Sequence, residues 1–245
     1  MTTPPTFASD QEYRSRVGDV GFWWPRVADA LKRHDLADGD HEPVAGVGGT
    51  YPTFLHGDVV VKLFGYVPSW RETHAAERAA HALIATDPGI AAPNVLAKGR
   101  LYDSHDASWP YLITTRMSGV AWGHADLSAE QRLAVATDMG RQIRRVHALN
   151  PSGVTPGEDW TALGITAAAE RSSLPPHLVA QVDDYIAGLD PFDSVFTHAD
   201  LTTRHVFVEN GRLTGIIDWG DATVADRHYE IIQPCRDIFD CDKAL

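Results

Sequence analysis

Residues 197–221 have the sequence THADLTTRHVFVENGRLTGIIDWGD, and this stretch decides the fold. Asn210-Gly211 lies between two runs rich in β-forming residues, which is the strongest short-range sign of a β-hairpin. Pairing outward from this turn predicts Glu209 opposite Arg212, His205 opposite Ile216 and Thr203 opposite Asp218. Because residues on one face recur at every second position, His205 and Asp218 are predicted to be diagonal neighbours, about 7–8 Å apart at the backbone.

The hairpin brings together groups that can bind a metal or accept a proton. Asp200 lies on the loop that leads into it, and His205 and Asp218 lie at its open end. Taken alone, an Asp in a loop is more often a turn former, and a His more often a hydrogen-bonded structural residue. One hairpin links all three residues, however, so we expect a metal and a general base here. The opposite face is predicted to be apolar, with Val206, Val208, Leu213 and Ile217.

The chain before this stretch predicts a sheet-rich first part and a helical second part. Strands are expected within residues 43–64, 94–101 and 109–116, with turns at residues 46–50 and 56–58. One helix is expected to begin at Pro25, another after Ser128, and further helical segments around residues 175–189. Another helix is expected from the apolar stripe Ala76, Ala80, Leu83 and Ile84, with Glu77 at the edge of the stripe. The Ser128 helix has a capping box with Gln131 and a predicted face of Leu133, Ala136, Gly140, Ile143 and His147.

The composition is that of a globular protein, with 245 residues, of which 44% are hydrophobic and 22% charged. The N-terminus lacks the apolar core of a secretion signal, and the longest apolar runs are strand-sized, so we expect neither secretion nor a membrane span. The net charge of −12 argues against a nucleic-acid partner, because phosphate contacts require clustered Lys and Arg. Cys235 and Cys241 lack the spacing of a zinc site and are interpreted as reduced thiols of a cytoplasmic protein.

The motif residues resemble those of the aminoglycoside phosphotransferases, the antibiotic-resistance branch of the protein-kinase-like fold. The pattern of that family is His-x-Asp, an Asn five residues after that Asp, and then a strand, a turn and a strand that ends in Ile-Asp-Phe/Trp. This chain has His198, Asp200 and Asp218, with His205 at the position of the Asn. Residues 60–65 and 109–119 resemble strands of hygromycin B phosphotransferases in particular, and the resemblance covers about residues 20 to 234.

The resemblance implies an α+β, two-lobed, protein-kinase-like fold. Residues 1–116 would form a nucleotide-binding lobe with an antiparallel sheet and one helix. Residues 117–245 would form a mainly helical catalytic and acceptor lobe that carries the catalytic loop and the metal-binding hairpin. The implied reaction, in the cytoplasm, transfers the γ-phosphate of ATP or GTP, with magnesium or manganese, to a hydroxyl of an aminoglycoside resembling hygromycin B, and so gives resistance.

The resemblance also assigns roles to single residues. Asp200 would be the base, Lys62 would meet the phosphates and be oriented by Glu77, and His205 and Asp218 would hold the metal. A turn without side chains at its glycines can lie close over phosphates. The turn residues are Gly46, Gly48, Gly49 and Thr50, the adenine-binding backbone is that of Thr115, Arg116 and Met117, and the lobe-stabilising acids are Asp226 and Glu230.

Two departures from the family pattern leave other functions open. His205 offers an imidazole nitrogen where magnesium prefers oxygen. The family continues for several helices after the Asp226 stretch, whereas this chain ends at Leu245, so we expect an abbreviated second lobe or a fragment. One alternative is a nucleotide-binding pseudokinase or truncated remnant without turnover. The other, a metal-dependent hydrolase with His198, Asp200, His205 and Asp218 as ligands, leaves Lys62 and Glu77 without a role.

The negative charge is concentrated in the last part of the chain. Residues 151–245 contain 6 basic and 16 acidic side chains, against 15 and 17 in residues 1–150. A solvated acidic surface explains this imbalance, and so does a site for a cationic ligand. Since a nucleotide is itself anionic, these acidic side chains are expected to attract the acceptor, which the resemblance implies is a small cationic aminosugar. We also expect the protein to be a monomer. The carboxylates that could hold such a partner include Glu158, Asp159, Asp221 and Asp237.

Overall fold

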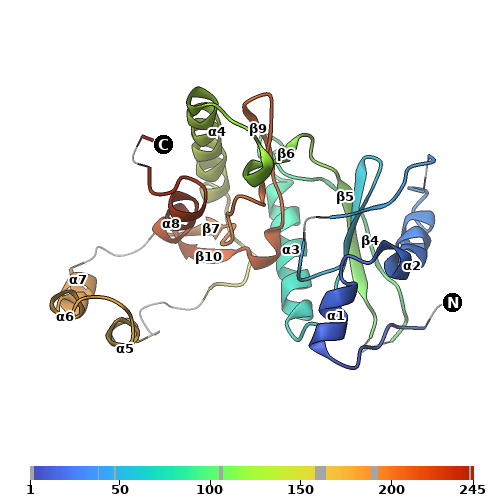
Figure 1. Cartoon of the computed structure of the whole chain (residues 1–245), viewed down its shortest axis with the longest axis horizontal. Helices are drawn as coiled ribbons and strands as arrows, with labels where there is room; N and C mark the ends of the chain where they lie inside the picture. The colour runs from blue at the N-terminus through green and yellow to red at the C-terminus, as the bar shows by residue number, and fades with distance from the viewer. Residues whose placement is uncertain are drawn as a thin grey trace.

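A five-stranded antiparallel sheet forms the centre of the first part of the chain (Figure 1). The computed structural model describes residues 3–37, 39–46, 48–104, 107–157, 164–188, 193–242 and 244–245. The strand order is β1-β2-β3-β5-β4, and all neighbouring strands are antiparallel. The strands are β1 (Val44–Ala45), β2 (Thr53–His56), β3 (Val59–Leu63), β4 (Val95–Arg100) and β5 (Pro110–Thr115). They lie within the three segments predicted from the sequence.

Helix α3 (Trp70–Ile84) stands between this sheet and the second part of the chain (Figure 1). Its predicted apolar stripe is confirmed, since Ala80 is fully buried and Ile84 is 5% exposed. Glu77 lies on the same buried side, with 5% of its surface exposed. A carboxylate is rarely buried to this extent unless it has a charged partner. The burial of Glu77 therefore indicates that it forms an ion pair in the interior.

Two helices precede the sheet, α1 (Asp10–Arg16) and α2 (Val20–Lys32). The prediction that Pro25 opens a helix is wrong, because Asp19 caps α2 and accepts a hydrogen bond from the Phe22 amide at 3.0 Å. Pro25 lies only one turn inside the helix, where its missing N–H removes a single backbone hydrogen bond. Helix α2 packs on the sheet through a buried cluster that contains Trp23, Val27, Leu31, Phe54, Val61 and Tyr111.

The second part of the chain combines helices with two small sheets, ordered β6-β8-β9 and β10-β7. Its strands are β6 (Val120–Ala121), β7 (Ser194–Thr197), β8 (Val206–Glu209), β9 (Arg212–Ile216) and β10 (Thr223–Asp226). Its α-helices are α4 (Ala129–His147), α5 (Ile165–Glu170), α6 (Pro176–Val179), α7 (Val182–Ala187) and α8 (Arg227–Asp237). Its described residues also include the 3-10 turns η1 (Trp122–His124) and η3 (Trp219–Asp221).

The start of helix α4 agrees with the sequence, and its predicted buried face is confirmed in part, since Ala136 is buried and Ile143 packs against the core. The capping box is present: the Ser128 side chain accepts a hydrogen bond from the Gln131 backbone amide, and the Gln131 side chain accepts one from the Ser128 backbone amide. Of the predicted face, Leu133 is 49% exposed and Gly140 is exposed. The buried residues are Val135, Ala136, Met139 and Val146. Of these, Val135, Met139 and Val146 pack into the core shared with β7, β8 and η3. The observed buried face therefore overlaps the predicted one at Ala136 and Ile143 but adds other positions, because tertiary packing and not the local pattern selected them.

The hairpin β8-β9 forms around the predicted turn but with a different register further out. Asn210 and Gly211 both have positive φ, at 52° and 72°, as a type I′ turn requires. Glu209 opposes Arg212 as predicted, but an irregularity between Phe207 and Val208 then shifts the pairing by one residue. Val206, not His205, therefore opposes Ile216. Beyond the strands, the Ile217 amide donates to the His205 carbonyl at 2.9 Å.

This shift exchanges the two isoleucines at the end of β9. Ile216 is 1% exposed and packs in the core, whereas Ile217, predicted on the apolar face, lines a cleft on the other side. The predicted pairing of Thr203 with Asp218 is also wrong, since β8 begins only at Val206. A β-bulge adds one residue to a strand and so reverses the faces beyond it.

Two smaller expectations concern the cysteines and membrane segments. Cys235 and Cys241 are free and exposed, in agreement with their interpretation as thiols. Among the described residues, no helix combines the length and apolar character needed to cross a membrane.

We expect acid to destabilise the protein through His81 of α3, which is 6% exposed. Burial, followed by the charge of Lys62, lowers the pKa of this imidazole to about 4, against about 6.5 in an unfolded chain. The unfolded state thus binds the proton more tightly, and the free energy of unfolding falls as the pH drops from about 6.5 to about 4, by up to about 1.4 kcal/mol per pH unit. His81→Gln should lose less stability over this range in urea unfolding. Equal pH dependence of the two proteins would contradict the assignment.

Candidate active site

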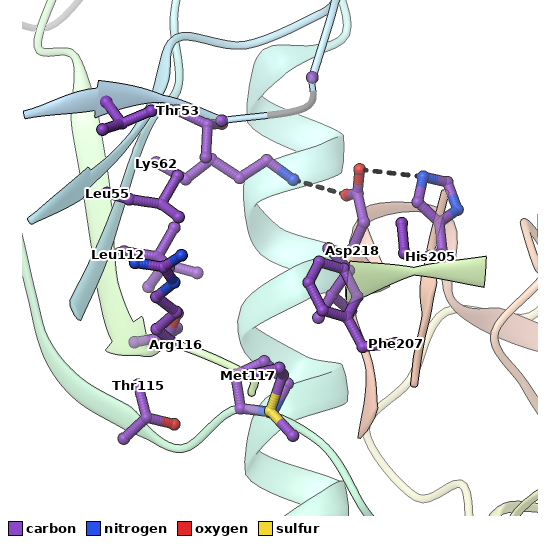
Figure 2. Close-up of a pocket in the computed structure, with 18 of the residues that line it drawn as sticks. Thr53, Leu55, Lys62, Leu112, Thr115, Arg116, Met117, His205, Phe207 and Asp218 are labelled. Atoms are coloured by element: carbon purple, nitrogen blue, oxygen red, sulfur yellow. Dashed lines mark hydrogen bonds and ion pairs between the residues drawn. The ribbon is translucent and has the colours of Figure 1, made fainter. Parts of the chain in front are cut away.

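Lys62 is held between two carboxylates where the two parts of the chain meet. Its Nζ lies 2.6 Å from Glu77 Oε2. It also lies 2.7 Å from Asp218 Oδ1 (Figure 2). The three residues come from β3, from α3 and from the end of the hairpin β8-β9. The Lys62 and Glu77 side chains are only 13% and 6% exposed. Three segments far apart in the sequence thus depend on one buried cation, as the resemblance implied for Lys62 and Glu77.

The electrostatics of this cluster keep Lys62 charged. Burial acts to lower the pKa of Lys62, but the charges of Glu77 and Asp218 outweigh it and raise that pKa. Burial likewise acts to raise the pKa of Asp218, yet Lys62 lowers it to about 2. Burial raises the pKa of Glu77 to about 7, against the opposing charge of Lys62. Asp218 is therefore the carboxylate that stays ionised throughout the range in which the protein would work.

The backbone around Asp218 fixes the direction of its side chain. Asp218 itself has a left-handed conformation, with φ at 66°, which non-glycine residues adopt only where the surroundings hold them. Trp219, fully buried, donates from its indole nitrogen to the Ile216 carbonyl at 3.1 Å. At Gly220 a Cβ would lie 2.8 Å from Thr73 Cγ2 on α3, so only glycine allows this close approach. These contacts turn the Asp218 carboxylate toward Lys62.

Asp200 lies on the loop between β7 and β8, and the backbone and the ring of His198 hold this loop in place. Both oxygens of Glu230, on α8, accept from the His198 amide at 2.9 and 3.0 Å. The His198 ring donates from Nε2 to the Ile217 carbonyl at 2.8 Å and accepts at Nδ1 from the Asp200 amide at 3.2 Å. Burial lowers the pKa of His198, which is consistent with this neutral form. With both ring nitrogens engaged, His198 serves as a structural anchor, and the Asp200 side chain remains 36% exposed.

His205 lies between Asp200 and Asp218. Its Nδ1 is 2.5 Å from the Asp200 carbonyl, which can only accept, so Nδ1 carries a proton. In the neutral ring Nε2 then has a free lone pair, and it lies 3.6 Å from Asp218 Oδ2 (Figure 2). The hairpin therefore brings these two side chains together, as the sequence predicted, although by a different register.

The pair His205 and Asp218 fits a magnesium or manganese ion that takes its remaining ligands elsewhere. Magnesium is commonly held by one or two carboxylates, together with substrate phosphates and water. Among the described residues no group of three or more His, Cys, Asp and Glu is arranged to hold a metal. That geometry does not support the alternative of a hydrolase centre built from His198, Asp200, His205 and Asp218.

A cleft of about 440 Å³ opens in front of Lys62. One wall is the sheet, with Leu55 and Leu112, and the facing wall is the hairpin, with Phe207 (Figure 2). Val60 and Ile217 also line the cleft. The cleft is also lined by the predicted residues Gly46, Gly48, Lys62, Glu77, Thr115, Arg116, Met117, His205 and Asp218. Most of the predicted nucleotide and metal residues thus surround one space.

Two predicted turn residues, Gly49 and Thr50, do not line this cleft. The Thr50 carbonyl instead accepts from the Tyr13 hydroxyl of α1 at 2.7 Å. A Cβ at Gly46 would lie 3.0 Å from Thr53 Cγ2, whereas one at Gly49 would meet nothing within 4 Å. The close approach that glycine permits is therefore needed at Gly46 and not at Gly49.

The sequence reasoning missed two residues near the site. Gln233 of α8 donates from Nε2 to Asp200 Oδ1 at 2.9 Å. Tyr51 packs beside Lys62, with Nζ 5.7 Å from the centre of its ring. The spacing of Glu230 and Gln233 by three residues places them on one face of a helix, and this signal could have identified Gln233.

The chain is similar to proteins that transfer phosphoryl groups. Residues 47–241 match the sequence profile of the phosphotransferase enzyme family. An aminoglycoside 3'-phosphotransferase of Streptomyces fradiae is 31% identical over 172 residues, which cover 61% of this chain and 59% of that protein. The chain therefore spans less than two thirds of the length of this curated relative.

The fold is similar to that of solved phosphotransferases. The GDP complex of wild-type aminoglycoside 2'-phosphotransferase-IIIa superposes with a TM-score of 0.71 at 18% identity, over 90% of this chain and 79% of that chain. The macrolide 2'-phosphotransferase MphH from Brachybacterium faecium does so with a TM-score of 0.61 at 20% identity, over 84% and 75%. These similarities confirm the predicted protein-kinase-like fold. Since the matching profile spans more than half of its residues, the chain belongs to the phosphotransferase enzyme family.

Proposed function

We propose that this protein transfers the γ-phosphate of ATP or GTP to a hydroxyl group of an aminoglycoside. The observation that carries the proposal is the position of Lys62, fixed by Glu77 and Asp218 in a cleft that His205 also lines. Asp200 lies beside His205, with Oδ2 3.5 Å from its Nδ1. Phosphoryl transfer requires little covalent chemistry from a protein. It requires that nucleotide, cation and acceptor hydroxyl are held in line and that their charge is neutralised.

In this proposal residues 1–116 form the lobe that binds the nucleotide. The apolar walls of the cleft would enclose the base, and the backbone of residues 115–117 would meet its polar edge. Lys62 would neutralise phosphate oxygens, and the turn at Gly46 would lie over them. In support, solved relatives by fold include a GDP complex and an ATP complex.

Residues 117–245 would form the catalytic and acceptor lobe. Asp218 and His205 would hold magnesium or manganese, which neutralises phosphate charge when bound. Asp200 would accept the proton of the acceptor hydroxyl as the oxygen attacks, so that the phosphoryl group moves from the nucleotide to that oxygen. The exposed part of the Asp200 carboxylate is available for this contact.

The acceptor is proposed to be a polycationic aminosugar such as hygromycin B, whose phosphorylation would give resistance. Asp221 supports this part, because burial and then the charges of Asp200 and Asp218 raise its pKa, as expected for a carboxylate with other carboxylates nearby. Asp237 is a weaker candidate than expected, since Arg236 already pairs with it at 2.6 Å. Glu158 and Asp159 lie outside the described residues. We further propose that the protein acts as a monomer in the cytoplasm, where ATP and GTP are present.

The proposal is tested first on the unmodified protein. Nucleotide with magnesium should raise the melting temperature, and the release of ADP or GDP should depend on an added aminoglycoside. A panel that contains hygromycin B, kanamycin, gentamicin and an uncharged sugar would identify the acceptor class. Nucleotide binding without turnover on any acceptor would instead favour the pseudokinase.

The first variant separates catalysis from binding. Asp200→Asn should lower kcat by about 10²–10⁴-fold, because the proton acceptor is lost. Nucleotide affinity, measured by calorimetry, should stay the same because Asp200 does not contact Lys62. A variant as active as the unmodified protein would contradict the role of Asp200.

The second set of variants concerns the metal. Asp218→Ala should weaken nucleotide binding in the presence of magnesium, since it removes the proposed carboxylate ligand. His205 should make manganese an unusually good substitute, because imidazole suits manganese better than magnesium. His205→Asn should shift the ratio of the two activities toward magnesium. An unchanged ratio would indicate that His205 only orders the loop.

The third prediction concerns ionic strength. Attraction between carboxylates and a polycation weakens as the Debye length shrinks from about 10 Å at 0.1 M salt to about 3 Å at 1 M. The acceptor KM should therefore rise steeply with salt, while the nucleotide KM changes less. Asp221→Asn should reduce this dependence, whereas the control Asp237→Asn, at a carboxylate already paired with Arg236, should not. Salt-independent acceptor kinetics would contradict a cationic acceptor.

A further inference from the structure

Gln233 touches the Asp200 carboxylate from helix α8. Its Nε2 lies 2.9 Å from Asp200 Oδ1, and both side chains are only partly exposed. Ionised carboxylate oxygens accept hydrogen bonds and never donate them, so the amide NH₂ group must face Asp200. Gln233 thus supplies a hydrogen-bond donor without a charge of its own.

One face of α8 holds the loop at two points. Glu230 accepts from the His198 amide, and Gln233, three residues later, donates to the Asp200 side chain. The first contact fixes the backbone of the loop. The second acts only on the carboxylate, whose other oxygen lies 3.5 Å from His205 Nδ1. Asp200 is therefore contacted on both of its oxygens, by an amide and by an imidazole.

We propose that Gln233 is a positioning residue that sets the rotation of the Asp200 carboxylate toward the acceptor hydroxyl, an inference that rests on the proposed phosphotransferase function. A carboxylate that is 36% exposed and lies at a loop has freedom to rotate about its Cβ–Cγ bond. A neutral amide restricts this rotation and leaves the negative charge available to a proton. A Lys or Arg at this place would pair with that charge and make the carboxylate a weaker base.

A purely structural role of Gln233 predicts different effects of its substitution on stability and kinetics. The loop is already attached to α8 through Glu230, whose two oxygens accept from the His198 amide. If Gln233 only anchored α8, its loss would lower the melting temperature and affect all kinetic constants together. If it orients Asp200, its loss should lower kcat and leave nucleotide binding intact, because misplacement of a reacting group acts on the chemical step.

The test uses two substitutions of similar shape and a control on the same helix. Gln233→Met removes the donor, and Gln233→Glu replaces it with an acceptor that repels Asp200. Each should lower kcat by about 10–100-fold, with the nucleotide KM unchanged. Ile232→Gln, at a neighbouring side chain that is 65% exposed, should leave kcat unchanged. Melting temperatures that fall together with a rise in nucleotide KM would assign Gln233 a structural role and overturn the proposal.

A double-mutant cycle with Asp200 makes the test specific. In the Asp200→Asn background no base remains to be oriented, so adding Gln233→Met should lower the residual kcat by less than about twofold. A full additional loss in that background would mean that Gln233 acts independently of Asp200, and would overturn the proposal while the phosphotransferase function stands. An unmodified protein without activity on any acceptor would overturn both.

Discussion

The ion pairs of Lys62 are the constraint on which the rest of the structure depends. A cation this deeply buried is costly unless carboxylates surround it, and the loss of either partner would leave charge uncompensated in the interior. Glu77 and Asp218 supply the two carboxylates, at 2.6 and 2.7 Å. Since they belong to α3 and to the hairpin, the sheet, the helix and the second part of the chain must keep one relative position for all three residues to meet.

The position of the hairpin in turn depends on packing below it. Ile216 and Trp219 are buried on either side of Asp218, and Gly220 allows the chain to touch α3. The irregularity within the β8-β9 pairing decides which isoleucine enters the core, and it thereby directs Ile217 to the cleft. In a regular hairpin with the same residues, Ile217 would lie on the core side and Ile216 on the cleft side. The geometry around Asp218 is thus a product of core packing as much as of polar contacts.

The sequence predicted what local chemistry dictates and missed what tertiary packing selects. The Asn210-Gly211 turn and the capping box at Ser128 follow from backbone rules and were predicted correctly. The resemblance to a known family supplied the pairing of Lys62 with Glu77, which no local pattern contains. The register beyond the turn, part of the buried face of α4 and the contact of Gln233 with Asp200 were not predicted, because each depends on packing against residues outside the local pattern.

The hydrogen bond from Tyr13 to the Thr50 carbonyl has a consequence for modular engineering of this protein. The segment that matches the family begins at residue 47, whereas Tyr13 belongs to α1, which lies outside it. The hydroxyl holds the turn next to the cleft, and the Tyr13 ring stacks on Tyr66 with centroids 4.4 Å apart. A chimaera cut at the family boundary would lose this support, and it would lose Gly46 of the turn as well. Grafts and minimal versions of the protein should therefore retain the first helix together with the turn.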